Sequence, residues 1–454
     1  MESFDLIVVG SGSGLEVASG LARRGRDVAV VEPGRLGGTC LNRGCIPSKM
    51  LIHRADIVEQ IKDSERFGIT AEVENIDFQG IVDEVNSDVH GDAESIEEGL
   101  KSSERHTLYR EEACFVGEKV LELKDSGKRI TSDTIVIAAG SRPFIPPIDG
   151  VEDVGYWVST DALNPDCRPD KLVMVGGGYI SLELAHFYEA MGSEVTILER
   201  GDRVLKREDR EVSEKITEIA AERYNVELGF SAKELREEDG RKKVLAENGE
   251  GEKAEFTADE VLIAAGRVPN TDSLKVEEAG IETTEHGFVK TDEKMRTNIE
   301  GIYALGDIAD NWMFKHSANH EAEVVFKNIV TGDEYSVDYP AMPHAVFTSP
   351  QIAGVGKTEQ QLEENRTEYV SAAYSYSDTG MGGALKEKDG FVKVLASEDG
   401  EILGCHIIGP HASQQIHEVL VAMKAGTGTV EDIKNTIHIH PALNEVVQRA
   451  FSNL

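Results

Sequence analysis

One pattern of strand, glycine turn, helix and second strand occurs twice in this chain, and it restricts the fold more than any other feature. The first copy spans residues 4–32 with its glycine turn at 10–12, and the second spans 171–199 with its turn at 176–178. A strand that enters a helix through a glycine turn is the unit of a parallel, doubly wound sheet. The repetition therefore predicts an α/β fold with two nucleotide-binding halves.

The length of 454 residues predicts about three domains. Apolar strands that end in glycine at 134–140 and 261–266 mark boundaries, and the Pro-rich segment 141–147 is predicted to be a connector, because consecutive prolines cannot continue a helix or a central strand. Strands alternate with helices in the last third. We expect two Rossmann-like nucleotide-binding domains, residues 1–145 with 270–338 and residues 146–269, and a C-terminal α+β domain, residues 339–454.

The first glycine turn resembles a dinucleotide-binding fingerprint. Gly10 allows the tight turn, Gly12 lets the backbone approach a pyrophosphate at the helix N-terminus, and the acidic Glu32 ends the next strand about twenty residues later. The third glycine of the fingerprint belongs at position 15, which is Leu15. We expect Gly14, beside it, to relieve the packing of helix on strand.

A second segment points to the kind of nucleotide that is bound. Residues 297–307 form an apolar strand pattern that ends in Gly-Asp, and Asp307 is suited to hold the ribityl chain of a flavin. Together with the first glycine turn, this segment predicts bound FAD.

Cys40 and Cys45 form the most informative pair in the sequence. Residues five apart in a regular α-helix face apart and lie too far from each other for a disulfide, so a bridge requires a distorted turn, for which Gly44 supplies the freedom. A zinc site would need further ligands nearby, and we expect no metal. The pair is therefore predicted to form a disulfide across a distorted turn. The cysteines predicted to be structural are Cys114, Cys167 and Cys405.

With this motif, the chain resembles the class I flavoprotein disulfide reductases, the family of glutathione, mycothione and dihydrolipoamide enzymes, over essentially its whole length. The resemblance implies that Cys45 is the thiolate next to the flavin and that Cys40 is the interchange thiol that attacks the substrate. It implies that Lys49 lies near the flavin and pairs with Glu183. The further FAD contacts that it implies are Gly38, Thr39 and Gly140.

The C-terminal segment 438–445 resembles the family signature His-x-His-Pro-x-x-x-Glu. By this resemblance, His440 takes a proton from the attacking thiol and returns it to the leaving thiolate, while Glu445 orients the ring. The pair is expected to reach the cysteine pair of the other subunit, which implies a homodimer. His438 is expected to be structural.

The second glycine turn is expected to bind the nicotinamide nucleotide. Glu199 matches the acid of the NADH-dependent lipoamide enzymes, whereas Arg200 and Lys206 match the two arginines of the NADPH-dependent glutathione enzymes. Because a basic cluster stands out in an acid-rich chain, we expect NADPH, with NADH as the alternative. The glycines expected to contact this nucleotide are Gly176, Gly178 and Gly266.

The charge balance excludes several partners. Lys and Arg number 47 against 83 Asp and Glu, a formal net charge of −36. A polyanionic surface repels nucleic acid and anionic membranes. The first residues lack a basic leader and no apolar run reaches membrane-spanning length, so we expect a cytoplasmic protein. An acid excess of this size also indicates adaptation to very high salt, where screening shortens self-repulsion.

The substrate prediction depends on smaller differences within the family. Segments 315–325 and 440–447 resemble mycothione reductases most closely. Lipoamide enzymes usually carry Thr where this chain has Ala442, and glutathione reductases carry paired arginines where it has Ser19 and Gly20. For an extreme halophile we expect the disulfide of γ-glutamylcysteine, bis-γ-glutamylcystine, to be reduced by NADPH. The alternatives are a NAD-linked dihydrolipoamide dehydrogenase and a binding subunit of an acyltransferase assembly.

Overall fold

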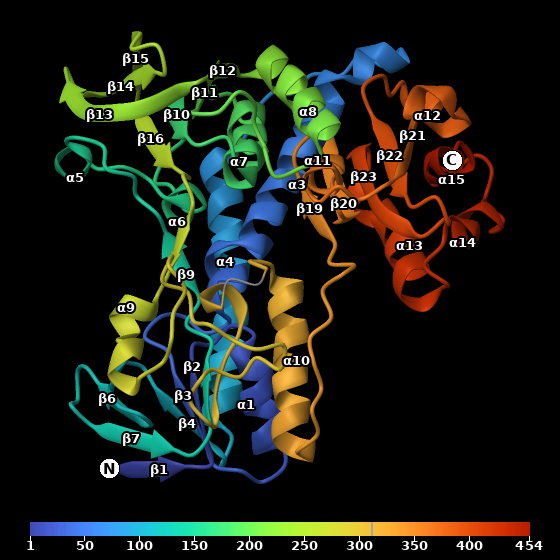
Figure 1. Ribbon diagram of the computed structural model, residues 1–454. Helices are drawn as coiled ribbons and strands as arrows, with labels where there is room; N and C mark the ends of the chain where they lie inside the picture. The colour runs from blue at the N-terminus through green and yellow to red at the C-terminus, as the bar shows by residue number, and fades with distance from the viewer. Residues whose placement is uncertain (310–311) are drawn as a thin grey trace.

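Five parallel strands form the sheet of the first nucleotide-binding unit in the computed structural model, which describes residues 1–309 and 312–454 (Figure 1). The two central strands of the repeat are buried along their full length, as expected for a parallel sheet that is covered on both faces. The strand order is β18 (Ile302–Ala304), β8 (Ile135–Ile137), β2 (Leu6–Val9), β3 (Val28–Val31) and β4 (His106–Tyr109).

Helices from both ends of this unit pack together. Helix α1 (Gly14–Ala22) contacts α10 (Lys315–Thr331), although the two are far apart in the sequence (Figure 1). The edge strand β18 also comes from after the second nucleotide-binding unit, so the chain completes this sheet only on its return. A four-stranded sheet adjoins it: β1 (Glu2–Phe4), β7 (Arg129–Ser132), β6 (Val120–Leu123) and β5 (Ala113–Gly117).

The connector predicted at 141–147 begins instead with a short strand. β9 (Ser141–Pro143) pairs antiparallel with β17 (Arg267–Pro269), so the outgoing and returning chains lie side by side. A two-stranded ribbon consists of edge strands only, and an edge strand tolerates proline because its lost N–H need not face a partner.

The second nucleotide-binding unit repeats the parallel arrangement. Its sheet contains β12 (Asn225–Leu228), β11 (Glu194–Glu199), β10 (Lys171–Val175) and β16 (Glu260–Ile263). Its helices are α7 (Tyr179–Ala190) and α8 (Arg210–Arg223), and an antiparallel sheet of β13 (Phe230–Glu238), β14 (Arg241–Asn248) and β15 (Lys253–Ala258) covers it.

Two helices from the first third of the chain pack on this second unit. Helices α3 (Cys45–Lys62) and α4 (Phe78–Lys101) share one apolar core with α7, in which Leu51 and Phe187 are fully buried. The helix that carries Cys45 is thus held against the helix that carries Glu183.

The C-terminal domain is an antiparallel sheet with helices, so the predicted α/β fold with a C-terminal α+β domain is confirmed. Its strand order is β19 (His344–Val346), β20 (Gln351–Gly356), β23 (Ile402–Gly409), β22 (Phe391–Ala396) and β21 (Val370–Ser375). Its helices are α11 (Glu359–Glu364), α12 (Gly380–Leu385), α13 (Ala412–Ala425), α14 (Val430–Lys434) and α15 (Glu445–Ser452).

A buried lysine ties this domain to the second nucleotide-binding unit. Lys393 on β22 is 2% exposed and lies within 3.0 Å of carboxylates on Asp209, Glu211 and Glu359.

The remaining helical segments are α2 (Gly38–Arg43), η1 (Ser64–Phe67), α5 (Val151–Val154), α6 (Ser159–Ala162), α9 (Thr271–Leu274), η2 (Val276–Ala279), η3 (Gly306–Ile308) and η4 (Tyr376–Asp378). Of the helices described, none combines the length and the apolar character needed to cross a membrane.

Candidate active site

A cavity of about 810 Å³ lies where the two nucleotide-binding units meet. Its walls include the turns at 10–13, 37–40 and 305–307 and the first residues of α7 and α10. Helices α1, α7 and α10 all begin here, and among the described residues no N-cap side chain bonds to their first N–H groups. Free N–H groups and the positive ends of helix dipoles favour an anionic ligand such as a pyrophosphate.

The first glycine turn requires glycine for reasons of space. Gly10 has φ +100°, and a Cβ there would lie 2.2 Å from the carbonyl oxygen of Ala138. A Cβ on Gly14 would lie 2.7 Å from a methyl group of Val8. Gly14 therefore provides the close packing of helix on strand expected from the third fingerprint glycine, and Leu15 packs against the core as an ordinary apolar residue.

Other residues predicted to contact FAD line the same cavity. A Cβ on Gly38 would lie 2.7 Å from the Cα atom of Gly12, so the two turns meet backbone to backbone. Thr39 and Gly140 also line the cavity. The close contact between the two turns requires glycine at position 38, and both turns line the cavity with backbone atoms.

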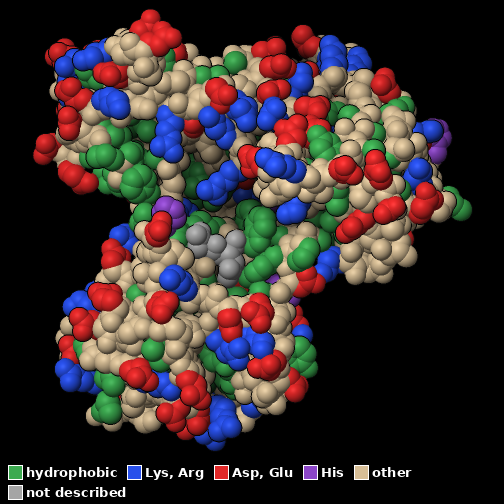
Figure 2. Space-filling view, viewed as in Figure 1, with side chains coloured by type: hydrophobic (Ala, Val, Ile, Leu, Met, Phe, Trp, Pro, Cys, Tyr) green, Lys and Arg blue, Asp and Glu red, His purple; other side chains and the backbone are tan. Residues whose placement is uncertain are grey.

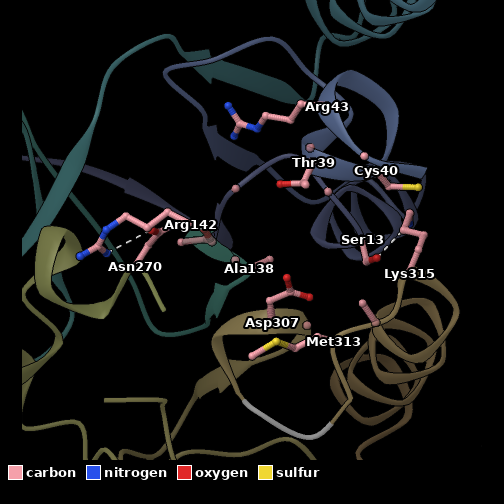
Figure 3. Close-up of a pocket in the computed structure, with 18 of the residues that line it drawn as sticks. Ser13, Thr39, Cys40, Arg43, Ala138, Arg142, Asn270, Asp307, Met313 and Lys315 are labelled. Atoms are coloured by element: carbon pink, nitrogen blue, oxygen red, sulfur yellow. Dashed lines mark hydrogen bonds between the residues drawn. The ribbon is translucent and has the colours of Figure 1, made fainter. Parts of the chain in front are cut away.

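The Gly-Asp turn presents its carboxylate to this cavity (Figure 3). Asp307 accepts a hydrogen bond from Ser141 Oγ at 2.7 Å and lies 3.6 Å from Arg267. The buried Glu321 holds the turn because it accepts a hydrogen bond from the N–H of Gly306 at 2.6 Å. The carboxylate of Asp307 is thus held at the cavity wall, where it is available as a hydrogen-bond acceptor.

An acidic residue holds each nucleotide turn in the same way. Glu32 accepts hydrogen bonds from the N–H groups of Ser11, at 3.0 Å, and Gly34, at 2.8 Å. Glu199 accepts two equivalent bonds in the second unit, both at 2.7 Å. Each carboxylate joins the end of the second strand to the turn, the place from which an acidic residue contacts a ribose.

The second turn is formed by Gly176 (φ +110°) and by Gly178, which precedes α7. Gly266 lies next to β17 and accepts a hydrogen bond from the N–H of Phe144 at 2.9 Å. None of the three lines the cavity described above, whereas Tyr179, which the sequence analysis did not single out, does. The three glycines predicted to contact the nicotinamide nucleotide therefore lie outside the lining of this cavity.

The basic residues after Glu199 are only partly neutralised. Lys206 lies 2.8 Å and Arg203 3.1 Å from the carboxylate of Asp202. Arg200 is exposed, and no ion pair of it is found among the described residues. The Nε atom of Arg203 is buried without a hydrogen-bond partner in the described part of the chain. Such a cluster has donors available for a phosphate.

A break between two helices brings the cysteines together. Gly44 separates α2 from α3 with φ −151° and ψ −115°, and a Cβ there would lie 2.9 Å from the carbonyl oxygen of Thr39. The thiols of Cys40 and Cys45 are close enough to form a hydrogen bond, and both line the cavity. The remaining cysteines lie apart, Cys114 and Cys405 buried and Cys167 exposed.

The two thiols differ in acidity. The hydrogen bond that Cys40 donates lowers the pKa of Cys45 to about 7, against burial, and the positive charge of Lys49 acts in the same direction. The same hydrogen bond, together with burial, raises the pKa of Cys40. Near neutral pH, Cys45 therefore carries the negative charge of the pair.

We expect this hydrogen bond to be visible in a pH titration. In Cys40→Ser, whose hydroxyl can still donate, the ultraviolet absorbance of the Cys45 thiolate should develop at a pH below the usual range of a thiol, because the donor that lowers the pKa of Cys45 is kept. In Cys40→Ala, the midpoint should move to higher pH, because the thiolate loses its donor. Subtracting the titration of the double variant Cys40→Ser, Cys45→Ser removes the contribution of Cys114, Cys167 and Cys405. Equal midpoints in the two Cys40 variants would contradict the assignment.

Lys49 on α3 and Glu183 on α7 lie side by side, with Lys49 Nζ 2.6 Å from Glu183 Oε2. The second oxygen of Glu183, a side chain that is 6% exposed, accepts a hydrogen bond from the N–H of Phe347 at 2.9 Å. The ammonium group of Lys49 also lies 4.7 Å from the centre of the Phe347 ring. The C-terminal domain thus supports the ion pair nearest the cysteines.

His440 and Glu445 are paired, but not at the cysteines of their own chain. His440 Nδ1 lies 2.9 Å from Glu445 Oε1, a contact that lowers the pKa of the glutamate. The His440 side chain is 76% exposed and does not line the cavity. Ile437 and Ile439 beside it are 96% and 80% exposed. Two neighbouring exposed isoleucines are typical of a surface that contacts another protein.

Two polar residues near the cysteines were not predicted, Ser13 and Lys315. Lys315 Nζ donates a hydrogen bond to Ser13 Oγ at 2.9 Å, and both line the cavity beside Cys40 (Figure 3). A lysine at the first position of a helix opposes the helix dipole. That unfavourable placement is the sequence signal that could have identified Lys315.

One group of side chains has the spacing of a metal site. Ligand atoms of Asp56, Glu59 and His186 lie within 4.8 Å of one another. Arg223 donates to Glu59 at 2.9 Å and lies 3.2 Å from His186 Nδ1. The group is therefore explained as an ion-pair network between α3, α7 and α8.

Comparison with known proteins supplies independent information. The family model described as pyridine nucleotide-disulphide oxidoreductase matches residues 4–322, and the model of its dimerisation domain matches 342–451. Dihydrolipoyl dehydrogenase 3 of Haloarcula marismortui is 36% identical over 99% of this chain and 96% of that protein. Mycothione reductase of Mycobacterium tuberculosis is 34% identical over the whole of both chains. The Cu(II) complex of the HOCl-induced flavoprotein disulfide reductase RclA from Escherichia coli matches with a TM-score of 0.89 and 27% identity over the whole of both chains.

Proposed function

Since the chain belongs to the pyridine nucleotide-disulphide oxidoreductases, we propose that it uses NADPH and FAD to reduce a small disulfide, bis-γ-glutamylcystine, at Cys40 and Cys45. The observation that carries the proposal is that Cys40 and Cys45 both line the cavity formed by the nucleotide turns. The family assigns disulfide oxidoreduction to the chain as a whole. The substrate and the nicotinamide nucleotide are the proposed parts.

The cavity residues fit FAD. The turns at Gly10 and Gly38 would hold its pyrophosphate with the N-terminus of α1, and Asp307 would hold its ribityl hydroxyls. Bound FAD supplies two-electron transfer from the nicotinamide to the cysteine pair.

The chain's own thiols carry out the exchange with substrate. Cys40 gives its proton to His440 of the partner subunit and attacks one sulfur of the substrate, so that the substrate disulfide breaks and a mixed disulfide with Cys40 forms. The released half leaves as a thiolate and takes a proton from His440 of the partner subunit. The Cys45 thiolate then attacks the Cys40 sulfur, releases the second half and restores the Cys40–Cys45 disulfide. The substrate gains the two electrons that the cysteine pair loses.

The dimer is part of this proposal. The match to a dimerisation domain and the exposed apolar residues Ile437 and Ile439 support a homodimer in which His440 reaches the other subunit. Glu445 is expected to hold the ring in position.

Three features support a small acidic disulfide and NADPH. Arg200, Arg203 and Lys206 form a basic cluster next to the second nucleotide turn. Ala442 follows Pro441, as the resemblance to mycothione reductases requires. Acidic side chains are spread over both lobes of the face in Figure 2, in keeping with a cytoplasmic enzyme of a high-salt cell.

A steady-state assay at high and low salt tests the proposal. It offers bis-γ-glutamylcystine, mycothione, oxidised glutathione and lipoamide, each with NADPH and with NADH. The highest kcat/KM should belong to bis-γ-glutamylcystine with NADPH. A higher kcat/KM for lipoamide with the NADH/NAD couple would overturn the proposal.

A NAD-linked dihydrolipoamide dehydrogenase is the second candidate, and one observation favours it. Glu199 is held at the end of β11 as Glu32 is held in the first unit, where an acid can bind a free ribose hydroxyl. The dihydrolipoyl dehydrogenase of Haloferax volcanii is also 37% identical over 99% of this chain and 96% of that protein.

Removing two cations of the basic cluster, Arg200 and Lys206, should lower activity with NADPH more than activity with NADH. We expect Arg200→Gly combined with Lys206→Ala to lower kcat/KM for NADPH by about ten- to hundredfold, because charge-assisted bonds to the phosphate are lost. The value for NADH should change by less than about threefold, since NADH has no phosphate at that position. Arg207→Ala, an exposed neighbour outside the cluster, is the control. Equal losses with both nucleotides would argue against a phosphate site.

A further inference from the structure

The basic residues that line the cavity differ in how far they are neutralised. Those residues are Arg43, Lys49, Arg142, Arg267 and Lys315. All but Arg43 and Lys315 lie within 3.6 Å of a carboxylate oxygen. For Lys315, the one carboxylate within 4.0 Å among the described residues is that of Glu16, at 3.9 Å. In a chain with a net charge of −36, such a cation is available for an anionic ligand.

Neutral groups hold the ammonium group of Lys315 in place. Its Nζ donates to Ser13 Oγ at 2.9 Å and contacts Asn319 Oδ1, while Ser13 Oγ donates to Asn319 at 2.8 Å. The Lys315 side chain is 33% exposed. The charge is therefore oriented in advance by acceptors that do not cancel it, which reduces the entropy lost when a ligand binds.

The position of Lys315 relative to the thiols is also informative. Lys315 and Ser13 lie on the same side of the cavity as Cys40, whereas Arg43 extends to the opposite side of Thr39 (Figure 3). The positive charge of Lys315 acts on Cys40 and lowers the pKa of its thiol, although the hydrogen bond to Cys45 and burial outweigh it. Of the two cations without a close carboxylate, Lys315 is the one beside the attacking thiol.

We propose that Lys315 binds a carboxylate of the disulfide substrate beside Cys40 and is a specificity-determining residue for acidic disulfides. The inference rests on the proposed function and names the cation that recognises its substrate. Both halves of bis-γ-glutamylcystine carry carboxylates, so either sulfur brings one near Lys315 when it reaches Cys40. A lysine at the N-terminus of α10 is unfavourable for the helix dipole, and binding a substrate carboxylate gives a reason for its position.

The test compares an acid with its ester. Lys315→Met removes the charge at similar length, and Lys315→Arg retains a charge. For bis-γ-glutamylcystine, Lys315→Met should lower kcat/KM by about ten- to hundredfold, mainly through KM, because a charge-assisted hydrogen bond is lost. For the fully methyl-esterified disulfide, the loss should stay below about threefold. Lys315→Arg should recover most of the activity with the acid.

Lys327→Met is the matched control, because Lys327 is on the same helix, pairs with Glu323 on the surface and does not line the cavity. FAD content and the rate of reduction by NADPH without disulfide are measured for each variant. If Lys315→Met lowers kcat/KM equally for the acid and for its methyl ester, the proposal is overturned. The charge of Lys315 would then act on Cys40 or on FAD and not on the carboxylate of the substrate. Unaltered kcat/KM for the acid would also overturn it.

The outcome for Lys315 can be separated from the outcome for the proposed function. If the wild-type enzyme does not reduce bis-γ-glutamylcystine, the proposed substrate is wrong. The variants are then compared with lipoate and lipoamide, which share the disulfide and differ in the carboxylate. Lys315→Met should lower the ratio of kcat/KM for lipoate to that for lipoamide, and an unaltered ratio would overturn the role of Lys315.

Discussion

Replacing Cys40 with alanine is expected to reduce disulfide turnover by roughly a thousandfold or more, because the thiol that forms the covalent mixed disulfide is lost. Cys45 and Lys49 remain on the cavity wall in this variant. The Cys45 thiolate should therefore persist at alkaline pH, with its long-wavelength absorption next to the flavin. The measurements are steady-state turnover and the absorption spectrum after reduction.

The control for this variant is Cys167→Ala, which removes an exposed cysteine that does not line the cavity. Its turnover should match that of the wild type. Persistent turnover in Cys40→Ala would assign the interchange role to another group. Loss of the long-wavelength absorption at all pH values would instead assign the flavin-facing thiolate to Cys40.

Replacing His440 with alanine is expected to lower kcat/KM for the disulfide by about a hundredfold or more, the usual contribution of general acid–base catalysis. The leaving thiolate then has no positioned proton donor. Glu445→Gln should have a smaller effect, because it removes only the partner that holds His440 Nδ1 at 2.9 Å. Near-normal kcat/KM for His440→Ala across the pH range would remove the residue from the mechanism.

A mixed dimer tests whether His440 acts across subunits. Neither a Cys40→Ala dimer nor a His440→Ala dimer contains a complete site. If His440 serves the cysteines of its partner, a dimer with one chain of each variant has one complete site, and random mixing should restore about a quarter of wild-type activity. If His440 serves its own chain, mixing restores nothing. The exposure of His440 and its absence from the cavity lining favour the first outcome.

Features that depend on neighbouring residues could be predicted from the sequence. The break between the helices at Gly44 and the turn at Gly10 follow from local sterics, because a Cβ would collide with backbone atoms at either position. The repeated strand and helix pattern predicted the two parallel sheets in the same way. The replacement of the third fingerprint glycine by Gly14 could be suggested, but the contact with Val8 that explains it belongs to the packed sheet.

Features that depend on which helices and strands pack together could not be predicted from the sequence. Spacing does not show that the chain around 141–143 pairs with 267–269, because the two strands come from opposite ends of the intervening domain. Composition shows an acid excess but not which cations lack a carboxylate, so Lys315 carried no predicted role. The sequence also did not show that Phe347, in the C-terminal domain, contacts the ion pair of Lys49 and Glu183.

The sequence by itself determined the glycine turns and the two parallel sheets, because these depend on steric constraints and on the apolar pattern within short segments. The family resemblance implied the pair of Lys49 and Glu183, whereas only the tertiary structure showed that Lys315 lies beside Cys40. Helices α1 and α10 bring Ser13 and Lys315 together, and the packing of α3 on α7 brings Lys49 to Glu183. The strength of a charge depends on its distance from other charges and on its burial, and both are set by packing between segments far apart in the chain.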